Sequence, residues 1–223
     1  MPINQDSLPK SLLYVGSSTL EHQIICGKAL VKKLKENGLM ANDRVLDLGC
    51  GSGRVAAPLT DYLTGSYEGF DIHKEAIEWC SSSITKEYKN FKFIHSDVYN
   101  AVYNKKGVLS ASTYVLPYKD NEFDYCFAFS LFTHLLPEDT RNYLCEIRRV
   151  IKVGGLCLAS FFVSCKNEDF DKNCESKYHY SYDYLINLFT LSGFFVEKFI
   201  KGCWDQPSEN KEYYQDCFVI RAR

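Results

Sequence analysis

VLDLGCGSGR, residues 45–54, is the stretch from which the fold can be worked out. A short apolar run ends in three glycines spaced two apart, Gly49, Gly51 and Gly53, and a segment typical of a helix follows at 54–63. Glycine permits unusual backbone dihedral angles and the close approach of a ligand. Backbone N–H groups at a helix start favour a polar or anionic ligand. The stretch therefore predicts a ligand-binding turn, although a tight strand–helix turn without a ligand would have the same glycines.

Two common phosphate-binding patterns do not fit this turn. A dinucleotide-binding turn has the spacing G-x-G-x-x-G, and counting from Gly49 puts Arg54 in the last position. The G-K-[ST] ending of a P-loop is missing as well. A nucleotide-dependent oxidoreductase is thus an alternative that the glycine spacing disfavours.

Strands and helices are expected to alternate from residue 44 to 163, which indicates a parallel sheet with right-handed crossovers. The last two expected strands have only a short connection without a helix, which favours an antiparallel pair at the sheet edge. A polar loop is expected over 164–180. The expected helices are 19–37, 54–63, 74–88, 137–152 and 182–193, and the expected strands are 44–49, 66–73, 91–97, 123–130, 156–163, 194–202 and 215–222.

Composition and charge narrow the class of partner. The chain has 26 Lys and Arg against 28 Asp and Glu, so it lacks the basic excess of most nucleic-acid-binding proteins. No apolar run reaches the roughly 18 residues of a membrane span, and MPINQDSLPK at the start lacks a signal-peptide pattern. We therefore expect a cytoplasmic protein that binds neither nucleic acid nor membrane. The oligomeric state does not follow from the sequence.

The ten cysteines are scattered and form no C-x-x-C pair. Most lie in apolar segments, where free cysteine packs as a small hydrophobic residue. A zinc site made of Cys165, Cys174 and His179 is conceivable by residue type, but the spacing is not typical of zinc ligands. We expect no metal.

Five segments in order carry a resemblance to a known family. VLDLGCGSGR is followed by FDIH (70–73), HSDV (95–98), FDYCFAFS (123–130) and RVIKVGG (149–155). Together they resemble the class I S-adenosylmethionine-dependent methyltransferases. The resemblance implies an α/β fold with a Rossmann-like seven-stranded, mostly parallel sheet. It implies the strand order 3-2-1-4-5-7-6, with strand 7 antiparallel and helices on both faces. It also implies one methyltransferase domain over 1–223, in which the segment 1–40 covers the cofactor and substrate site.

The resemblance also implies S-adenosyl-L-methionine as cofactor, S-adenosyl-L-homocysteine as product, and roles for individual residues. The first motif holds the methionine part of the cofactor. Asp71 binds the two ribose hydroxyls, and the adjoining Ile72 is also a cofactor-binding residue. Asp97 and Val98 lie near the adenine amino group. Phe129, Ser130 and Leu131 lie beside the transferable methyl. The first motif comprises Asp47, Gly49, Cys50, Gly51, Gly53 and Arg54.

Helix N-capping is the alternative role for Asp71 and Asp97, because Asp is a common N-cap residue. Both acids, however, are expected at strand ends after the glycine turn. That combination favours cofactor binding.

Methyl transfer requires chiefly that acceptor, methyl and sulfur be aligned, and a base is needed only when the acceptor must lose a proton. His134, just after the expected strand 123–130, is the candidate base, with packing or capping at the next helix as the alternative. Aromatic and histidine side chains expected near the acceptor are Tyr14, His179, Tyr180 and Trp204.

The acceptor class is inferred from what the chain lacks. No [DNS]-P-P-[YFW] motif, Pro-Cys nucleophile or magnesium-binding acid follows the expected strand 123–130. With the near-neutral charge, these features favour a small-molecule substrate and O-methylation of a sugar-like or other metabolite. The alternatives are N-methylation of a protein or small amine, and a non-catalytic cofactor-binding adaptor that kept the fold.

Overall fold

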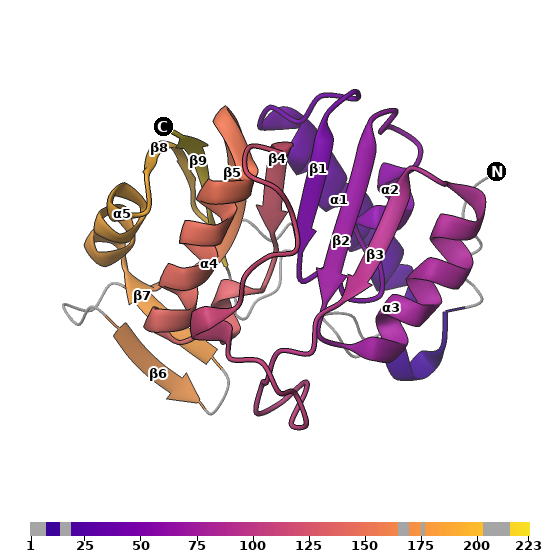
Figure 1. The fold of residues 1–223 in the computed structure, drawn as a ribbon, viewed down its shortest axis with the longest axis horizontal. Coiled ribbons are helices and arrows are strands. Elements are labelled where there is room, and N and C mark those ends of the chain that lie inside the picture. The colour runs from indigo at the N-terminus through magenta and orange to yellow at the C-terminus, as the bar shows by residue number, and fades with distance from the viewer. Residues whose placement is uncertain (1–7, 14–18, 165–169, 175–176, 203–214) are drawn as a thin grey trace. The chain divides into compact units, whose positions relative to one another are not determined.

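A computed structural model describes residues 8–13, 19–164, 170–174, 177–202 and 215–223 (Figure 1). The chain forms two compact units, Met1–Gly107 and Val108–Arg223. Each unit combines strands with helices in the alternation that the sequence predicts. A single domain over 1–223 stays a prediction.

The described part of the first unit contains three parallel strands in the order β3-β2-β1. They are β1 (Arg44–Leu48), β2 (Ser66–Asp71) and β3 (Phe91–His95). Val45, Leu46 and Leu48 of β1 are completely buried, as expected of a parallel strand covered on both faces. The register pairs Asp71 with His95, so the carboxyl ends of β2 and β3 lie side by side.

Three helices accompany these strands: α1 (Leu20–Glu36), α2 (Ala56–Leu59) and α3 (Lys74–Cys80). A short 3₁₀ helix, η2 (Lys10–Leu12), precedes them. The N-cap of α1 is Thr19, whose hydroxyl oxygen accepts a hydrogen bond from the His22 N–H. Figure 1 shows α3 beside β2 and β3.

Two of the expected helices in this unit differ from the structure. The helix expected over 54–63 is only the single turn α2, with turns on both sides. The helix expected over 74–88 is α-helical only to Cys80 and continues as a π-helical segment, η3 (Ser81–Thr85). Three consecutive serines, which hydrogen-bond locally and weaken α-helix, immediately follow Cys80.

The second unit contains the parallel pair β4 (Phe123–Ala128) and β5 (Ile151–Ser164). The C-terminal strand β9 (Asp216–Ala222) lies between β5 and β8 (Phe194–Ile200) and is antiparallel to both. The order β4-β5-β9-β8 confirms the expected antiparallel ending of the sheet. Helices α4 (Pro137–Val150) and α5 (Tyr182–Leu191) and the 3₁₀ turns η4 (Ala111–Thr113) and η5 (Phe132–His134) complete the unit.

The prediction of a polar loop over 164–180 is wrong. The structure has an antiparallel hairpin there, β6 (Phe170–Cys174) and β7 (Lys177–Ser181), and β7 pairs in parallel with the end of β5. In β7, Tyr178 and Tyr180 are buried while their neighbours are half-buried. This period of two is typical of a strand with one covered face.

Cys26, Cys50, Cys80, Cys126 and Cys157 are free and buried, which agrees with a packing role. Cys145 is exposed and Cys217 is disulfide-bonded, so these two depart from that expectation. Among the described helices, none is long and apolar enough to cross a membrane.

Candidate cofactor site

The glycine turn between β1 and α2 adopts a conformation that requires glycine. Gly49, Gly51 and Gly53 have φ angles of 80°, 52° and 74°, a region in which side chains other than glycine are strained. The Gly49 and Cys50 N–H groups donate to the Phe70 carbonyl oxygen at 2.9 and 3.1 Å. The turn is thereby attached to the carboxyl end of β2.

Asp71, the last residue of β2, is held by two backbone donors. The Gly51 N–H donates to Asp71 Oδ2 and the His73 N–H donates to Oδ1, each at 2.8 Å. Burial raises the pKa of Asp71, and these two N–H groups oppose that shift. Each carboxylate oxygen has a second acceptor position, so the oriented, half-buried carboxylate can still accept a hydroxyl hydrogen on either oxygen.

Helix capping does not account for either strand-end acid. The N-cap of α3 is His73, whose Nδ1 accepts from the Ala76 N–H at 3.3 Å. Asp97 is followed by a loop, in which Asn104 Nδ2 donates to Asp97 Oδ1 at 3.0 Å and to the Val98 carbonyl oxygen at 3.1 Å. Ile72, next to Asp71, has its carbonyl oxygen 3.2 Å from His95 Nε2.

Asp47, in the middle of β1, is 3% exposed. The Tyr67 hydroxyl of β2 donates to Asp47 Oδ2 at 2.6 Å. Burial raises the pKa of Asp47 to about 7, the Tyr67 hydrogen bond opposes this shift, and the nearby Asp71 adds to it. The Arg54 guanidinium attracts Asp47 electrostatically, while burial lowers the pKa of Arg54.

Helix α1 lies against the glycine turn. A Cβ at Gly27 would collide with the Arg54 carbonyl oxygen, so only glycine allows this approach. Gln23 Nε2 of α1 donates to the Ser52 hydroxyl at 3.1 Å, and that hydroxyl lies 3.4 Å from the Leu12 carbonyl oxygen. The beginning of the chain thus contacts the turn through Gln23 and Ser52.

In the second unit, the segment after β4 has a strained residue. Ser130 has a φ of 61°, unusual for a residue with a side chain. Its N–H donates to the buried Ser160 hydroxyl at 2.8 Å, Ser160 donates to Gln215 Oε1 at 2.6 Å, and Gln215 Nε2 donates to Ser130 Oγ at 2.7 Å. This closed ring of three hydrogen bonds fixes Ser130 between Phe129, which is 6% exposed, and the half-buried Leu131.

Comparison with known proteins shows the family to which the chain belongs. The model of the methyltransferase domain family matches residues 46–159, just over half of the chain. This chain belongs to the methyltransferase domain family. The family is that of the class I S-adenosylmethionine-dependent enzymes which the five segments resemble.

An uncharacterized methyltransferase of Schizosaccharomyces pombe is 28% identical to this methyltransferase-family chain over 162 residues, 72% of this chain and 51% of the relative. The O-methyltransferase rstn1 of Aspergillus nomiae is 27% identical over 129 residues, 56% of this chain and 51% of the relative. The chain spans about half the length of these curated relatives.

A solved structure supports the fold. The 1,6-didemethyltoxoflavin-N1-methyltransferase of Burkholderia thailandensis, solved with 1,6-didemethyltoxoflavin and S-adenosylhomocysteine, superposes with a TM-score of 0.64 at 16% identity. The superposition covers 91% of this chain and 79% of that one. The chain therefore has the Rossmann-like methyltransferase fold.

The residues expected near the acceptor are only partly described. His134 ends η5 just after β4 and is half-buried. The ring of His179 stacks on Phe162 with centroids 5.0 Å apart. Tyr14 and Trp204 lie outside the described residues, as does Cys165 of the conceivable zinc set. Within the described residues, no group of three His, Cys, Asp or Glu side chains could hold a metal ion.

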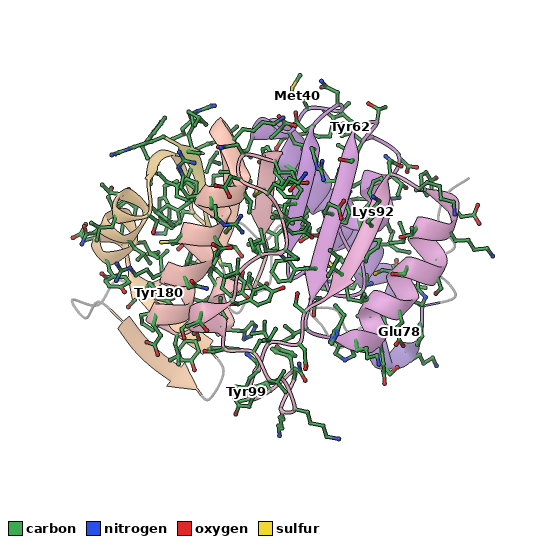
Figure 2. The ribbon with its side chains drawn as sticks, viewed as in Figure 1. Met40, Tyr62, Glu78, Lys92, Tyr99 and Tyr180 are labelled. Atoms are coloured by element: carbon green, nitrogen blue, oxygen red, sulfur yellow. The ribbon has the colours of Figure 1, made fainter. Side chains whose placement is uncertain are left out.

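Tyr180 does not fit the expected role in substrate binding. Its side chain is completely buried beside α4 (Figure 2), and its hydroxyl donates to the Leu135 carbonyl oxygen at 2.6 Å. The Tyr180 hydroxyl oxygen is also 3.0 Å from the Thr140 hydroxyl oxygen. Tyr180 therefore belongs to the core of the methyltransferase fold, and we remove it from the set of substrate residues.

Two residues of the site were not found from the sequence. Tyr67 lies in a strand where an aromatic residue is usual, and nothing in SYEGFD shows that its hydroxyl faces Asp47. Gln23 is one polar residue in an amphipathic helix. The sequence does contain a signal for Gln23. It lies on the buried face of the helix, where the other residues, such as Cys26, Gly27 and Leu30, are small or apolar.

Proposed function

We propose that this chain transfers a methyl group from S-adenosylmethionine to a small-molecule acceptor, most simply to a hydroxyl group. The observation that carries the proposal is the Asp71 carboxylate, oriented by the Gly51 and His73 N–H groups at the end of β2. A ribose diol offers two O–H donors, and the two oxygens of Asp71 each have an acceptor position for one of them. The two acceptor oxygens of Asp71 therefore fit the ribose of a nucleoside cofactor.

The glycine turn agrees with a nucleoside that carries no pyrophosphate. Arg54 stands where a dinucleotide-binding turn has its last glycine. A Cβ on Gly53 would come within 2.8 Å of Ile84 Cδ1, so this third glycine of the turn serves packing against η3. The remaining glycines allow the backbone between β1 and α2 to approach the amino-acid part of the cofactor closely.

When bound, S-adenosylmethionine supplies a methyl group already activated by a positively charged sulfur. The residues of the chain have the tasks of binding, orienting and excluding water. Asp71 would hold the ribose, the turn at Gly49 and Gly51 would hold the methionine part, and Asp97 with Val98 would border the adenine. Ser130, fixed by its ring of hydrogen bonds, would line the acceptor side.

Hydroxyl acceptors are favoured over amines by the relatives as well as by the sequence. The A. nomiae relative is an O-methyltransferase by name, whereas the B. thailandensis protein is an N-methyltransferase that shares the fold. A hydroxyl must lose its proton during transfer, and His134 at the end of η5 is our candidate for the base.

Activity assays with a panel of hydroxyl-bearing and amine-bearing small molecules test this proposal. We expect formation of S-adenosylhomocysteine together with a methylated hydroxyl compound in mass spectrometry. His134→Ala should lower turnover by about 10²- to 10⁴-fold, the usual contribution of a general base. The affinity for S-adenosylhomocysteine should stay unchanged.

Ser192→Ala, which removes a buried hydroxyl on α5's C-cap, is the matched control and should keep full turnover. Methylation of amines alone would contradict the proposed acceptor class. Full turnover of a folded His134→Ala variant on a hydroxyl acceptor would exclude His134 as the base.

A further inference from the structure

Gln23 has one polar atom without a partner. The side chain lies in the first turn of α1 and is 3% exposed. Its Nε2 donates to the Ser52 hydroxyl, but its Oε1 is buried and has no hydrogen-bond partner among the described residues. A buried carbonyl oxygen without a donor destabilises a fold, and nearly all such groups in proteins are paired. A hydrogen-bond donor from outside the described residues is therefore needed to pair Gln23 Oε1.

The position of Gln23 points to the kind of donor. Ser52, its hydrogen-bond partner, lies in the glycine turn between Gly51 and Gly53. The Gly51 N–H of the same turn donates to Asp71. Gly27, one helical turn after Gln23, brings α1 against the Arg54 backbone. The carboxamide is thus hydrogen-bonded to the same glycine turn that orients the proposed ribose-binding acid.

A packing role alone does not explain a glutamine at this position. The other buried residues of α1 are apolar or small: Cys26, Gly27, Leu30, Val31 and Leu34. A leucine or methionine at position 23 would fill the space without leaving an unpaired oxygen. Gln23 is therefore best explained by a ligand whose donor completes the carboxamide.

We propose that Gln23 binds the amino-acid end of S-adenosylmethionine, with Oε1 accepting a hydrogen bond from the α-ammonium group. This inference rests on the proposed function and adds a residue to the cofactor site. An ammonium group has three donors and no acceptor, which matches an unpaired carbonyl oxygen. Because Oε1 is covered without a ligand, the Gln23 amide or the first turn of α1 must move when the cofactor binds.

Two ligands that differ at the amino-acid end test the assignment. S-adenosylhomocysteine carries the amino and carboxylate groups, whereas 5′-methylthioadenosine has the same nucleoside and sulfur without them. Calorimetry on Gln23→Met, an apolar side chain of similar size, should show an affinity for S-adenosylhomocysteine about 10- to 100-fold lower, the loss expected for a hydrogen bond to a charged group. The affinity for 5′-methylthioadenosine should stay unchanged.

Gln23→Glu keeps an acceptor and adds a negative charge opposite the ammonium, so it should retain the preference for S-adenosylhomocysteine. Leu30→Ala, a buried apolar position of the same helix, is the control for weakened packing and should leave the ratio of the two affinities as in the wild type. Thermal unfolding identifies the variants that fold. If Gln23→Met does not fold, the affinities of Gln23→Glu for the two ligands test the proposal.

Several results would overturn the inference. An unchanged ratio of affinities in Gln23→Met would mean that Gln23 has a structural role, for example holding a buried water. Loss of S-adenosylhomocysteine binding in Gln23→Glu would mean that the carboxamide faces the carboxylate instead of the ammonium. If the wild-type chain binds 5′-methylthioadenosine but shows no preference for S-adenosylhomocysteine, the nucleoside site stands and the role of Gln23 fails. If it binds neither ligand, the proposed function fails first.

Discussion

Asp47 and Asp71 lie close together in the first unit and have different environments. Asp71 is half-buried and accepts from two backbone N–H groups. Asp47 is almost completely buried and accepts a hydrogen bond from the Tyr67 hydroxyl. The first environment favours a carboxylate that binds a ligand from solvent, and the second raises the pKa of Asp47 to about 7.

This raised pKa predicts a pH dependence of stability. The folded chain keeps the Asp47 proton up to about pH 7, whereas the unfolded chain loses it near the ordinary value of 3.8. Between these values the unfolded state binds fewer protons, so the free energy of unfolding contributed by Asp47 falls as the pH rises. The fall is at most about 4 kcal/mol, since one pKa unit corresponds to about 1.4 kcal/mol.

Asp47→Asn should abolish the pH-dependent contribution of Asp47 to the free energy of unfolding. Denaturant unfolding of the wild type and the variant from pH 4 to pH 8 measures this contribution. The wild type should lose stability relative to the variant as the pH rises through this range. A constant difference between the two proteins would mean that Asp47 ionises normally in the folded chain.

At the residue scale, the sequence predicted the groups whose position directly after an expected strand indicates a role. Asp71 and Asp97 follow strands, and the glycines follow a strand as well, so topology alone brings them to one edge of the sheet. The Tyr67–Asp47 and Gln23–Ser52 hydrogen bonds join residues 20 and 29 positions apart. Both depend on side-chain packing, which spacing does not reveal.

At the scale of elements, the ring of Ser130, Ser160 and Gln215 connects the end of β4 with β5 and the residue before β9. It holds Ser130 in a left-handed conformation that costs roughly 1–2 kcal/mol for a residue with a side chain. Strain of this kind is found mostly where a functional segment is held in place by its surroundings. The C-terminal strand thereby contributes to the shape of the segment after β4.

Ser160→Ala should destabilise the chain by about 1–3 kcal/mol, because it leaves the Ser130 N–H and Gln215 Oε1 unpaired. Ser130→Gly, which relieves the left-handed strain, should recover part of this loss in the double variant. Denaturant unfolding at a constant pH measures both effects.

The control for this pair is Ser192→Ala, since the Ser192 hydroxyl is buried without a hydrogen-bond partner in the described part of the chain. Its removal should leave stability unchanged or slightly higher. A Ser160→Ala variant as stable as this control would show that the ring contributes little.

The elements that the sequence predicted well are those with strong periodicity and clear ends, such as α1, α4 and the four strands from β1 to β4. The hairpin of β6 and β7 was missed because its polar residues suggested a loop, although Tyr178 and Tyr180 alternate with less buried neighbours. The π-helical η3 was missed because the sequence pattern of a π-turn hardly differs from that of an α-helix.

At the scale of the molecule, each unit contains residues to which the proposal gives a role. In the first unit these are the glycine turn, Asp71, Asp97 and Gln23, and in the second they are Ser130 and His134. The family match spans residues from both units. The cofactor could therefore be predicted from ordered strand-end motifs, whereas no motif in the sequence identifies the acceptor.

The central claim is that Asp71 and the glycine turn bind S-adenosylmethionine. Calorimetry of S-adenosylhomocysteine with the wild type, Asp71→Ala and the exposed control Asp61→Ala tests it most directly. Asp71→Ala should weaken binding by about 1.5–3 kcal/mol, roughly 10- to 150-fold, the value of a hydrogen bond to a charged group. Asp61→Ala should bind as the wild type does, and NAD should not bind. Equal affinity of a folded Asp71→Ala variant, or binding of NAD in place of S-adenosylhomocysteine, would contradict the account.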